Sequence, residues 1–327
     1  MTTEPTFASS TTAARHLTPG AFLRRALFRI PPGEASVDKR GFQVRDPSIR
    51  THIEAIGARF VESFNLAIVS ASLDEMVRAL DLAEPRYRGF GYEGAAMGLA
   101  VRDALGPGPS LWQSFVRGPA AHQEYISVVG RGWALARLPG PPSWHLRNLT
   151  GPLRWLAFDG YGFHAGFFDW RRSVDRCRRS GRFGGYAARA FDQGLGRSLW
   201  FVRGADTAAI IAAIARFDPS RQADLWAGVG LAATYAAGAD PQQLSKLKEA
   251  SGQHCSALRQ GAVFAAEARF KAGIVTAQTE AALSQLCGLD VAQASRLATQ
   301  TRPPDDQADP QGTAYDAWRR DIQRHFE

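Results

Sequence analysis

Apolar residues spaced three and four positions apart mark the first part of the chain. Asp46 and Pro47 precede one such run, which consists of Ile49, Ile53, Ile56, Phe60, Phe64 and Ile68. An aspartate followed by a proline at the first helical position is typical of a helix start, and the spacing places the apolar residues on one face. Ser72 and Glu75 form a capping box before a second stripe of Leu73, Met76, Val77 and Leu80. We therefore predict two consecutive helices here.

Pairs of glycines separated by one residue recur through the middle of the chain. The pairs are Gly89/Gly91, Gly130/Gly132, Gly160/Gly162, Gly194/Gly196 and Gly228/Gly230, and Gly261 follows as a single glycine. From residue 160 onward the intervals are 34, 34 and 33 residues. A period near 34 is the length of one helix–turn–helix unit in a tetratricopeptide-like array. Glycines let two helix backbones approach closely, but the same gap could admit a flat ligand.

The remaining pattern favours a fold made of helices alone. No run shows sustained alternation of apolar and polar residues, and the segments around 153–168 and 226–237 are apolar nearly all round, as in helices covered on every side. We predict an all-α, helical-repeat-like fold of about 34-residue units packed into one compact domain over residues 20–302. A disordered leader (1–19), a linker (303–312) and a C-terminal docking helix (313–327) complete the predicted organisation.

The charge, cysteine content and hydropathy of the chain indicate the cellular compartment in which we expect the protein. The 327 residues carry a formal net charge of +8, which keeps the chain soluble and could also attract acidic partners. The three cysteines, Cys177, Cys255 and Cys287, lie far apart without a CxxC pair, which argues against a zinc ribbon or a disulfide framework. No apolar run approaches the roughly 18 residues of a membrane helix, and no secretory signal opens the chain. We therefore expect a cytoplasmic protein.

Two arginine-rich segments raise the question of charged partners. Phe22, Leu23, Ala26, Leu27 and Ile30 share one helical face opposite Arg24, Arg25 and Arg29, so this helix either lies on an anionic membrane or docks on its own domain. A second cluster contains Arg171, Arg172, Arg176, Arg178, Arg179 and Arg182, but aspartates interrupt it and no aromatic ladder accompanies it. We interpret this second cluster as a solvated face and expect no nucleic acid partner.

Familiar catalytic motifs are absent or occur in the wrong context. Residues 89–94 match GxGxxG, but no strand precedes them and position 114, where a dinucleotide site needs an acidic residue, is serine. Residues 305–309 spell DDxxD within a proline-flanked linker, which indicates a solvated acidic loop. The chain lacks a Walker A sequence, a GxSxG elbow and an HExxH motif. The motifs that usually identify P-loop enzymes, elbow-type hydrolases and zincins are therefore missing, which argues against these classes.

Polar residues inside the apolar central helices are the best candidates for a site. Burying an unpaired charge is costly, so such residues pair, shift their pKa or take part in chemistry. Tyr161 and His164 share a helical face, while Asp159 is turned about 140° from His164. His122 and Tyr125 repeat the spacing of three. The predicted catalytic residues are His164, Tyr161, Asp159, His122 and Glu93.

Aromatic residues near these positions suggest the walls of a pocket. We predict a substrate-binding surface of Trp133, Phe163, Trp200 and Arg197. Arg189 and Asp192, three residues apart, are expected to form an ion pair. Helical di-iron sites show Glu-x-x-His, and none of the seven histidines has a glutamate three residues before it, so no metal ligands are predicted and the cofactor stays open. The alternative is that these polar residues only fix helix packing.

Several long motifs resemble a bacterial family known as domain of unknown function 1702. They include the segments at 23–28, 89–98, 132–137, 159–164, 191–201 and 221–226, and the resemblance extends from about Phe22 to Phe326. It implies a genomic setting beside enediyne polyketide synthases, whose product is a long conjugated polyene. The resemblance carries over no catalytic residue.

Two functional hypotheses follow. The first is a biosynthetic enzyme or accessory protein that acts on an apolar polyene or polyketide-derived molecule, with an acidic carrier protein as a further partner. The second is a non-catalytic helical-repeat scaffold for protein–protein interaction. An enzyme predicts a closed internal pocket where His164 and Glu93 converge, whereas a scaffold predicts an open groove with those residues in mutual contacts.

Overall fold

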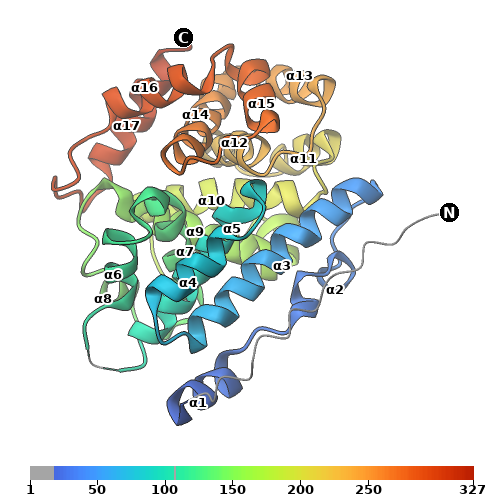
Figure 1. The fold of residues 1–327 in the computed structure, drawn as a ribbon. Helices are drawn as coiled ribbons and strands as arrows, with labels where there is room; N and C mark the ends of the chain where they lie inside the picture. The colour runs from blue at the N-terminus through green and yellow to red at the C-terminus, as the bar shows by residue number, and fades with distance from the viewer. Residues whose placement is uncertain (1–17, 107) are drawn as a thin grey trace.

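The computed structural model describes residues 18–106 and 108–327, and within them every regular element is a helix. The all-α prediction is therefore confirmed. Long helices form the body of the molecule (Figure 1): α3 (Pro47–Val69), α5 (Pro85–Asp103), α7 (Glu124–Arg137), α9 (Trp155–Phe168), α10 (Tyr186–Val202), α12 (Pro219–Tyr235) and α14 (Cys255–Lys271). Shorter helices alternate with them: α4 (Leu73–Asp81), α6 (Leu111–Arg117), α8 (Pro142–His145), α11 (Thr207–Ile214), α13 (Pro241–Ala250) and α15 (Ala277–Cys287).

The two ends of the chain add the remaining helices. α1 (Pro19–Phe28) lies at the edge of the molecule, and α2 (Val37–Arg40) leads into α3 (Figure 1). α16 (Val291–Thr301) and α17 (Thr313–Arg324) close the other end. Single turns of other helix types fill the connections: η1 (Pro32–Ala35), η2 (Ala121–Gln123), η3 (Pro152–Arg154), η4 (Arg171–Asp175) and η5 (Gly252–His254).

The residues predicted to begin α3 and α4 act as N-terminal caps of these helices. The Asp46 carboxylate accepts hydrogen bonds from the backbone N–H groups of Ser48 and Ile49, and Pro47 is the first residue of α3. The Ser72 hydroxyl caps α4 by accepting from the N–H of Glu75. Five of the six apolar residues predicted for the stripe of α3 are buried, and Ile49 is partly buried.

The long helices pack side by side in chain order, and α10 and α12 run in the same direction. Near the start of α10, Arg189 pairs with Asp224 of α12, and near its end the Trp200 indole donates to the carbonyl of Ala237. Glycines bring the backbones together at these contacts. A Cβ atom on Gly194 would collide with the Asp159 carbonyl oxygen, and one on Gly160 with the Val129 carbonyl oxygen.

The intervals between the long helices are less regular than the sequence suggested. From α3 to α14, successive starts are separated by 31 to 39 residues. A strict repeat of about 34 residues stays a prediction.

Packing at both ends of the long helices encloses the interior. At one end, His52 of α3 contacts the carbonyl of Ala236 after α12, and Arg269 of α14 donates to the carbonyl of Arg86 in α5. At the opposite end, α17 packs against α14 and α16. The Arg319 side chain of α17 also pairs with Asp224 of α12. The middle of the long helices is thus covered from both ends.

The segment 303–312 is more firmly held than a solvated acidic loop. Asp309 is only 3% exposed, and its carboxylate accepts hydrogen bonds from the Trp155 indole and from the backbone N–H groups of Ala314 and Tyr315. The expectation of a solvated loop is therefore wrong for Asp309, because this residue caps α17 and ties it to the start of α9. Most of the predicted leader, residues 1–17, lies outside the described residues.

Two general expectations can be compared with the described residues. No helix among them has the length and apolar character needed to cross a membrane. The three cysteines are free thiols.

Candidate functional site

Five polar residues meet in the interior, and we call them the polar layer. They are Glu93 of α5, Asp159 of α9, Gln193 and Arg197 of α10, and Tyr235 at the end of α12. Each is at most 3% exposed. Each of these four helices packs at least one glycine against the backbone of a neighbouring long helix, and this close packing brings the five side chains into a shared interior.

An ion pair forms one side of the polar layer. Arg197 Nη1 lies 2.5 Å from Asp159 Oδ1, and Gln193 Nε2 donates to Asp159 Oδ2 at 2.8 Å. The Arg197 guanidinium also lies over the ring of Phe163, 4.7 Å from its centroid. Burial by itself would lower the pKa of Arg197, but Asp159 and Glu93 outweigh it and raise that pKa. Arg197 is therefore a fixed positive charge in the interior.

Glu93 is the residue best suited to proton transfer. Its Oε1 accepts a hydrogen bond of 2.8 Å from the Trp133 indole, while its Oε2 is buried without a partner. Burial raises the pKa of Glu93 to about 7, although Arg197 and the Trp133 hydrogen bond act in the opposite direction. A carboxyl group with a pKa near neutral pH can both donate and accept a proton, as a general acid–base catalyst must.

Two further polar atoms in the layer are unpaired. The Tyr235 hydroxyl is buried without a partner and lies so close to Gly89 that a Cβ there would collide with it. The Oε1 atom of Gln193 is also buried and unpaired. Buried polar atoms without partners are rare because each costs free energy. Three of them in one layer indicate a place where a bound molecule or water supplies the missing hydrogen bonds.

An apolar cavity lies on each side of the polar layer. Glu93 lines the first cavity together with Phe60, Trp133, Phe163, Phe167 and Phe201. Arg197 and Tyr235 line the second with Tyr125, Leu231, Phe264 and Trp318. Each cavity measures about 40 Å³, little more than the roughly 30 Å³ of one water molecule. A larger ligand must therefore displace some of the aromatic side chains.

The structure brings five of the predicted site residues together. Glu93, Asp159 and Arg197 belong to the polar layer, and Trp133 and Phe163 line the first cavity. Trp200 lines neither cavity. Its indole donates to the Ala237 carbonyl at 2.8 Å, so it joins α10 to the end of α12 instead of forming a wall.

His164 lies on the other side of Trp133 from the polar layer. Its ring contacts the Trp133 indole with a centroid distance of 5.5 Å, and Arg137 Nε donates to its Nε2 at 3.2 Å. Burial, and to a smaller extent Arg137, lowers the pKa of His164 to about 3, so it stays neutral at ordinary pH. The expected convergence of His164 and Glu93 is wrong, because Trp133 separates them.

Tyr161 and His122 are also directed elsewhere. The Tyr161 hydroxyl lies 3.4 Å from Ser180 Oγ, and its ring packs against Phe183. His122 packs against the ring of Tyr92 at 5.4 Å, and burial lowers its pKa. Neither residue reaches the polar layer.

Gln193 and Tyr235 were missed by the sequence analysis. Gln193 carried a usable signal, since it is a polar residue beside a glycine pair in a helix with buried neighbours. Tyr235 carried none, because only the packing of the end of α12 against α5 places it beside Gly89.

Within residues 18–106 and 108–327, no group of three or more His, Cys, Asp or Glu side chains is arranged to hold a metal ion.

Comparison with known proteins gives one match. A family model described as "Protein of unknown function (DUF1702)" matches residues 20–326. Neither the curated proteins nor the solved structures contain a match to this chain.

Proposed function

Since this chain belongs to the DUF1702 family of proteins of unknown function, we propose that it binds an extended apolar small molecule inside the helical body and acts on it through the polar layer. The ligand class we favour is a polyene or polyketide-derived chain from bacterial secondary metabolism of the enediyne type. One observation carries the proposal: Glu93 and Tyr235 each line an apolar cavity, and each has a buried polar atom without a hydrogen-bond partner.

Proton transfer is the chemistry that these residues support best. The Glu93 carboxylate would remove a proton from the saturated carbon at the end of a conjugated unsaturated carbonyl chain, and the resulting carboxylic acid would return the proton to a carbon nearer the carbonyl group. The net change is a shifted double bond, with no oxidation or reduction. The Tyr235 hydroxyl and the positive charge of Arg197 would stabilise the negative charge that develops on the carbonyl oxygen.

Tyr235 also marks a route into the interior. It lines the second cavity and, in addition, a surface hollow of about 240 Å³ that His52, Arg86 and Arg269 help to form. Movement of this one side chain would connect the hollow with the cavity. We propose that an apolar chain enters here.

Titration with a conjugated tetraene fatty acid, which fluoresces more strongly in apolar surroundings, tests binding. We expect saturable binding to the full chain and loss of binding in Leu231→Trp, which fills the second cavity. Ala208→Trp, on the exposed face of α11, is the matched control. Circular dichroism and thermal unfolding establish that both variants fold. Absence of saturable binding to the native chain would overturn the proposal.

A second measurement separates chemistry from binding. A shifted double bond changes the ultraviolet absorption of a conjugated carbonyl chain, so incubation with such a chain reports turnover. We expect Glu93→Gln to bind the tetraene but leave the absorption spectrum unchanged. Binding without turnover by the native chain would support the accessory role rather than the enzyme. If neither occurs, the scaffold alternative and an acidic carrier protein partner remain the hypotheses to pursue.

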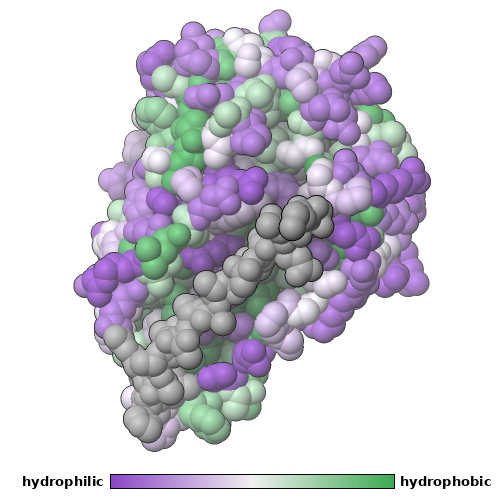
Figure 2. All heavy atoms as spheres, turned by 45° about the vertical axis from the view of Figure 1, so that its right-hand side comes forward, coloured by the Kyte–Doolittle hydropathy of each residue, from purple (hydrophilic) through white to green (hydrophobic). Residues whose placement is uncertain are grey.

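α1 suggests how an apolar ligand is delivered. Phe22, Leu23 and Leu27 are 67%, 57% and 67% exposed, and arginines lie beside them on the same helix. Elsewhere on the face that Figure 2 shows, apolar side chains form small patches among polar ones. We propose that α1 rests on an anionic lipid surface. Leu23→Glu with Leu27→Glu should abolish sedimentation with phosphatidylglycerol vesicles, whereas Leu82→Glu, at a position 89% exposed elsewhere, should not.

A further inference from the structure

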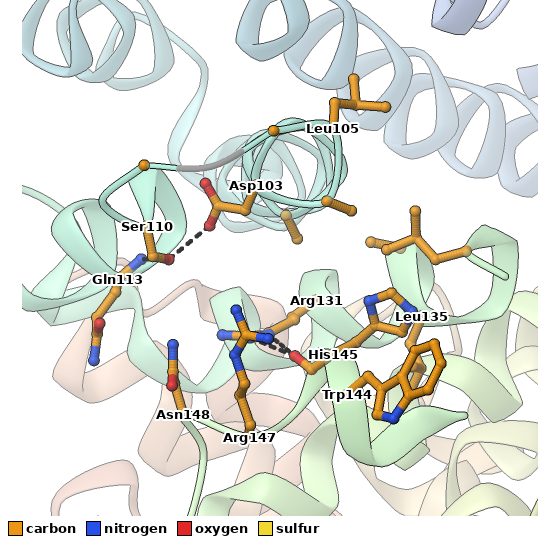
Figure 3. A pocket seen from close by; sticks show the side chains of 16 residues that line it. Asp103, Leu105, Ser110, Gln113, Arg131, Leu135, Trp144, His145, Arg147 and Asn148 are labelled. Carbon is orange, nitrogen blue, oxygen red and sulfur yellow. Dashed lines mark hydrogen bonds between the residues drawn. The ribbon is translucent and has the colours of Figure 1, made fainter. Parts of the chain in front are cut away.

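A surface cleft of about 600 Å³ lies outside the interior site, between the end of α5, α6, α7 and α8 (Figure 3). One part of its wall is apolar, with Leu105, Leu135, Leu138 and Trp144. Another part is cationic and polar, with Arg131, Arg147, Asn148 and Gln113. The cleft therefore offers two chemically different surfaces to a single ligand.

Arg131 is held in place by neighbouring residues, but one of its guanidinium nitrogens has no hydrogen-bond acceptor. Its Nε donates to the His145 carbonyl at 3.1 Å, and its guanidinium lies 4.5 Å above the Trp112 ring. Its Nη1 atom is buried and has no partner. Burial, with a smaller contribution from Arg147, lowers the pKa of Arg131 to about 10, although the charge of Asp103 acts in the opposite direction. A buried guanidinium nitrogen without an acceptor costs free energy until an acceptor arrives.

Arg147 adds a second positive charge. Figure 3 shows its side chain beside that of Arg131 on the same wall of the cleft. It is exposed, and no hydrogen bond or ion pair to it is found among the described residues. Two adjacent guanidinium groups repel each other, and one bound anion would remove that repulsion and satisfy the unpaired nitrogen.

The acidic residue in the cleft, Asp103, forms no ion pair with Arg131 or Arg147 in the part of the chain that the structure describes. The Asp103 carboxylate accepts hydrogen bonds from Ser110 Oγ at 2.6 Å and from the N–H groups of Leu111 and Trp112, which cap α6. Figure 3 places Asp103 and Ser110 together across the cleft from Arg131. The Asp103 carboxylate thus already has hydrogen-bond partners, whereas Arg147 and the Nη1 atom of Arg131 have no acceptor within the described residues.

We propose that this cleft binds a phosphate monoester that carries a short apolar arm. A phosphate dianion matches two guanidinium groups in charge and in its number of acceptor oxygens. Trp144 is 66% exposed and, with the leucines, provides an apolar surface for the arm. The site does not depend on the polar layer, because α7 separates them: Trp133 lines the interior and Leu135 lines the cleft.

Isothermal titration of the full chain with decyl phosphate, inorganic phosphate and decanoate tests this proposal. Decyl phosphate should bind best, and Arg147→Ala should weaken it by about tenfold or more. Arg296→Ala, an exposed arginine of α16, is the matched control and should bind as the native chain does. Trp144→Ala should weaken decyl phosphate but not inorganic phosphate.

Two comparisons make the test decisive. The variants Glu93→Gln and Leu231→Trp should bind decyl phosphate unchanged, which shows that the ligand is not in the interior. Decanoate binding as tightly as decyl phosphate to the Leu231→Trp variant, or an Arg147→Ala variant with native affinity, would overturn the phosphate assignment. Loss of decyl phosphate binding in Leu231→Trp would do the same and would assign the ligand to the interior cavity.

Discussion

Two clusters of buried charge share α10 and α12 but are built differently. The polar layer consists of side chains from α5, α9 and α10 and from the end of α12. Near the starts of α10 and α12 lies a second cluster, the arginine–aspartate network, in which Asp192, Asp224 and Asp316 pair with Arg179, Arg189, Arg221, Arg319 and Arg320. The three aspartates of the network are as deeply buried as the charged residues of the layer, at 0% to 5% exposed.

The difference lies in how completely the polar atoms are paired. Asp224 accepts from Arg189 at 3.1 Å and from Arg319 at 2.7 Å, so both of its oxygens are used. In the polar layer, Glu93 leaves one oxygen unpaired and Tyr235 leaves its hydroxyl unpaired. Buried charge by itself therefore does not indicate a site. Incomplete pairing beside a cavity distinguishes the polar layer from a network that only stabilises the fold.

Removing a carboxylate from the network should have the largest effect. Asp224→Ala leaves Arg319, a 2% exposed arginine, without its ionic partner, and we expect a loss of about 3–5 kcal/mol in the free energy of unfolding. Urea denaturation measures this loss. Asp321→Ala removes an exposed partner of Arg324 and should change stability by less than about 1 kcal/mol. Equal effects would show that the network is not structurally important.

Replacing Glu93 with a neutral residue should increase the free energy of unfolding, whereas Asp224→Ala should decrease it. The folded chain keeps Glu93 protonated up to about pH 7, whereas the unfolded chain releases the proton near pH 4.5, so this residue makes stability fall as pH rises through that window. Glu93→Gln removes this dependence and should be more stable than the native chain at pH 8 by up to about 3 kcal/mol. Urea denaturation at pH 5 and pH 8 measures the difference.

The control for this experiment is Glu280→Gln, an exposed glutamate of α15. Subtracting the native curve removes contributions common to both proteins, such as that of His164, whose lowered pKa acts in the other direction. A Glu93→Gln variant that is less stable than the native chain at pH 8 would contradict the account of the polar layer.

Forcing α9 and α10 apart should lower the stability of the fold by a smaller amount. This substitution tests the close helix contact that positions Asp159 and Gln193 in the polar layer. Gly194→Ala introduces a methyl group against the Asp159 carbonyl oxygen, and we expect a loss of about 2 kcal/mol. Gly184→Ala is the matched control, because nothing lies within 4 Å of the added carbon. If both substitutions leave the thermal midpoint unchanged, the close approach of the two helices is not required.

Removing the hydroxyl group from one tyrosine in each cluster should have the smallest effects on stability. The Tyr186 hydroxyl in the network donates to Asp316 at 3.2 Å, so Tyr186→Phe should cost about 1 kcal/mol. The Tyr235 hydroxyl in the polar layer has no partner, so Tyr235→Phe should be neutral or stabilising. Thermal unfolding of both variants gives the answer. A destabilising Tyr235→Phe would reveal a hydrogen bond and weaken the case for a ligand there.

Local interactions follow from the sequence more reliably than long-range ones. Asp46 and Ser72 cap the helices as expected, because each capping group and its target lie within three residues. Arg189 and Asp192 were expected to pair with each other, and this prediction is wrong. Arg189 reaches Asp224 and Asp316, because neighbouring helices offer carboxylates at better positions than its own helix does.

Only part of the candidate site was predicted from the sequence, because the site also depends on long-range packing. Polar residues inside apolar helices were correctly expected to be buried, and Glu93, Asp159 and Arg197 do meet. His164, Tyr161 and His122 do not join them, although their types and spacing looked equally suitable. Which face of a helix points to the centre depends on its rotation against its neighbours, and no single helix contains that information.

The residue pattern alone was sufficient to predict that this chain is helical, where several of its helices begin and that Glu93 and Asp159 are buried. Hydrogen bonds within a few residues and the helical period of apolar positions are sufficient for that. Only the tertiary structure decided which buried polar atoms remain unpaired, since Glu93 and Tyr235 are 142 residues apart and meet through packing alone. Pairing is a property of neighbours in space, and it is pairing that separates a stabilising network from a candidate site.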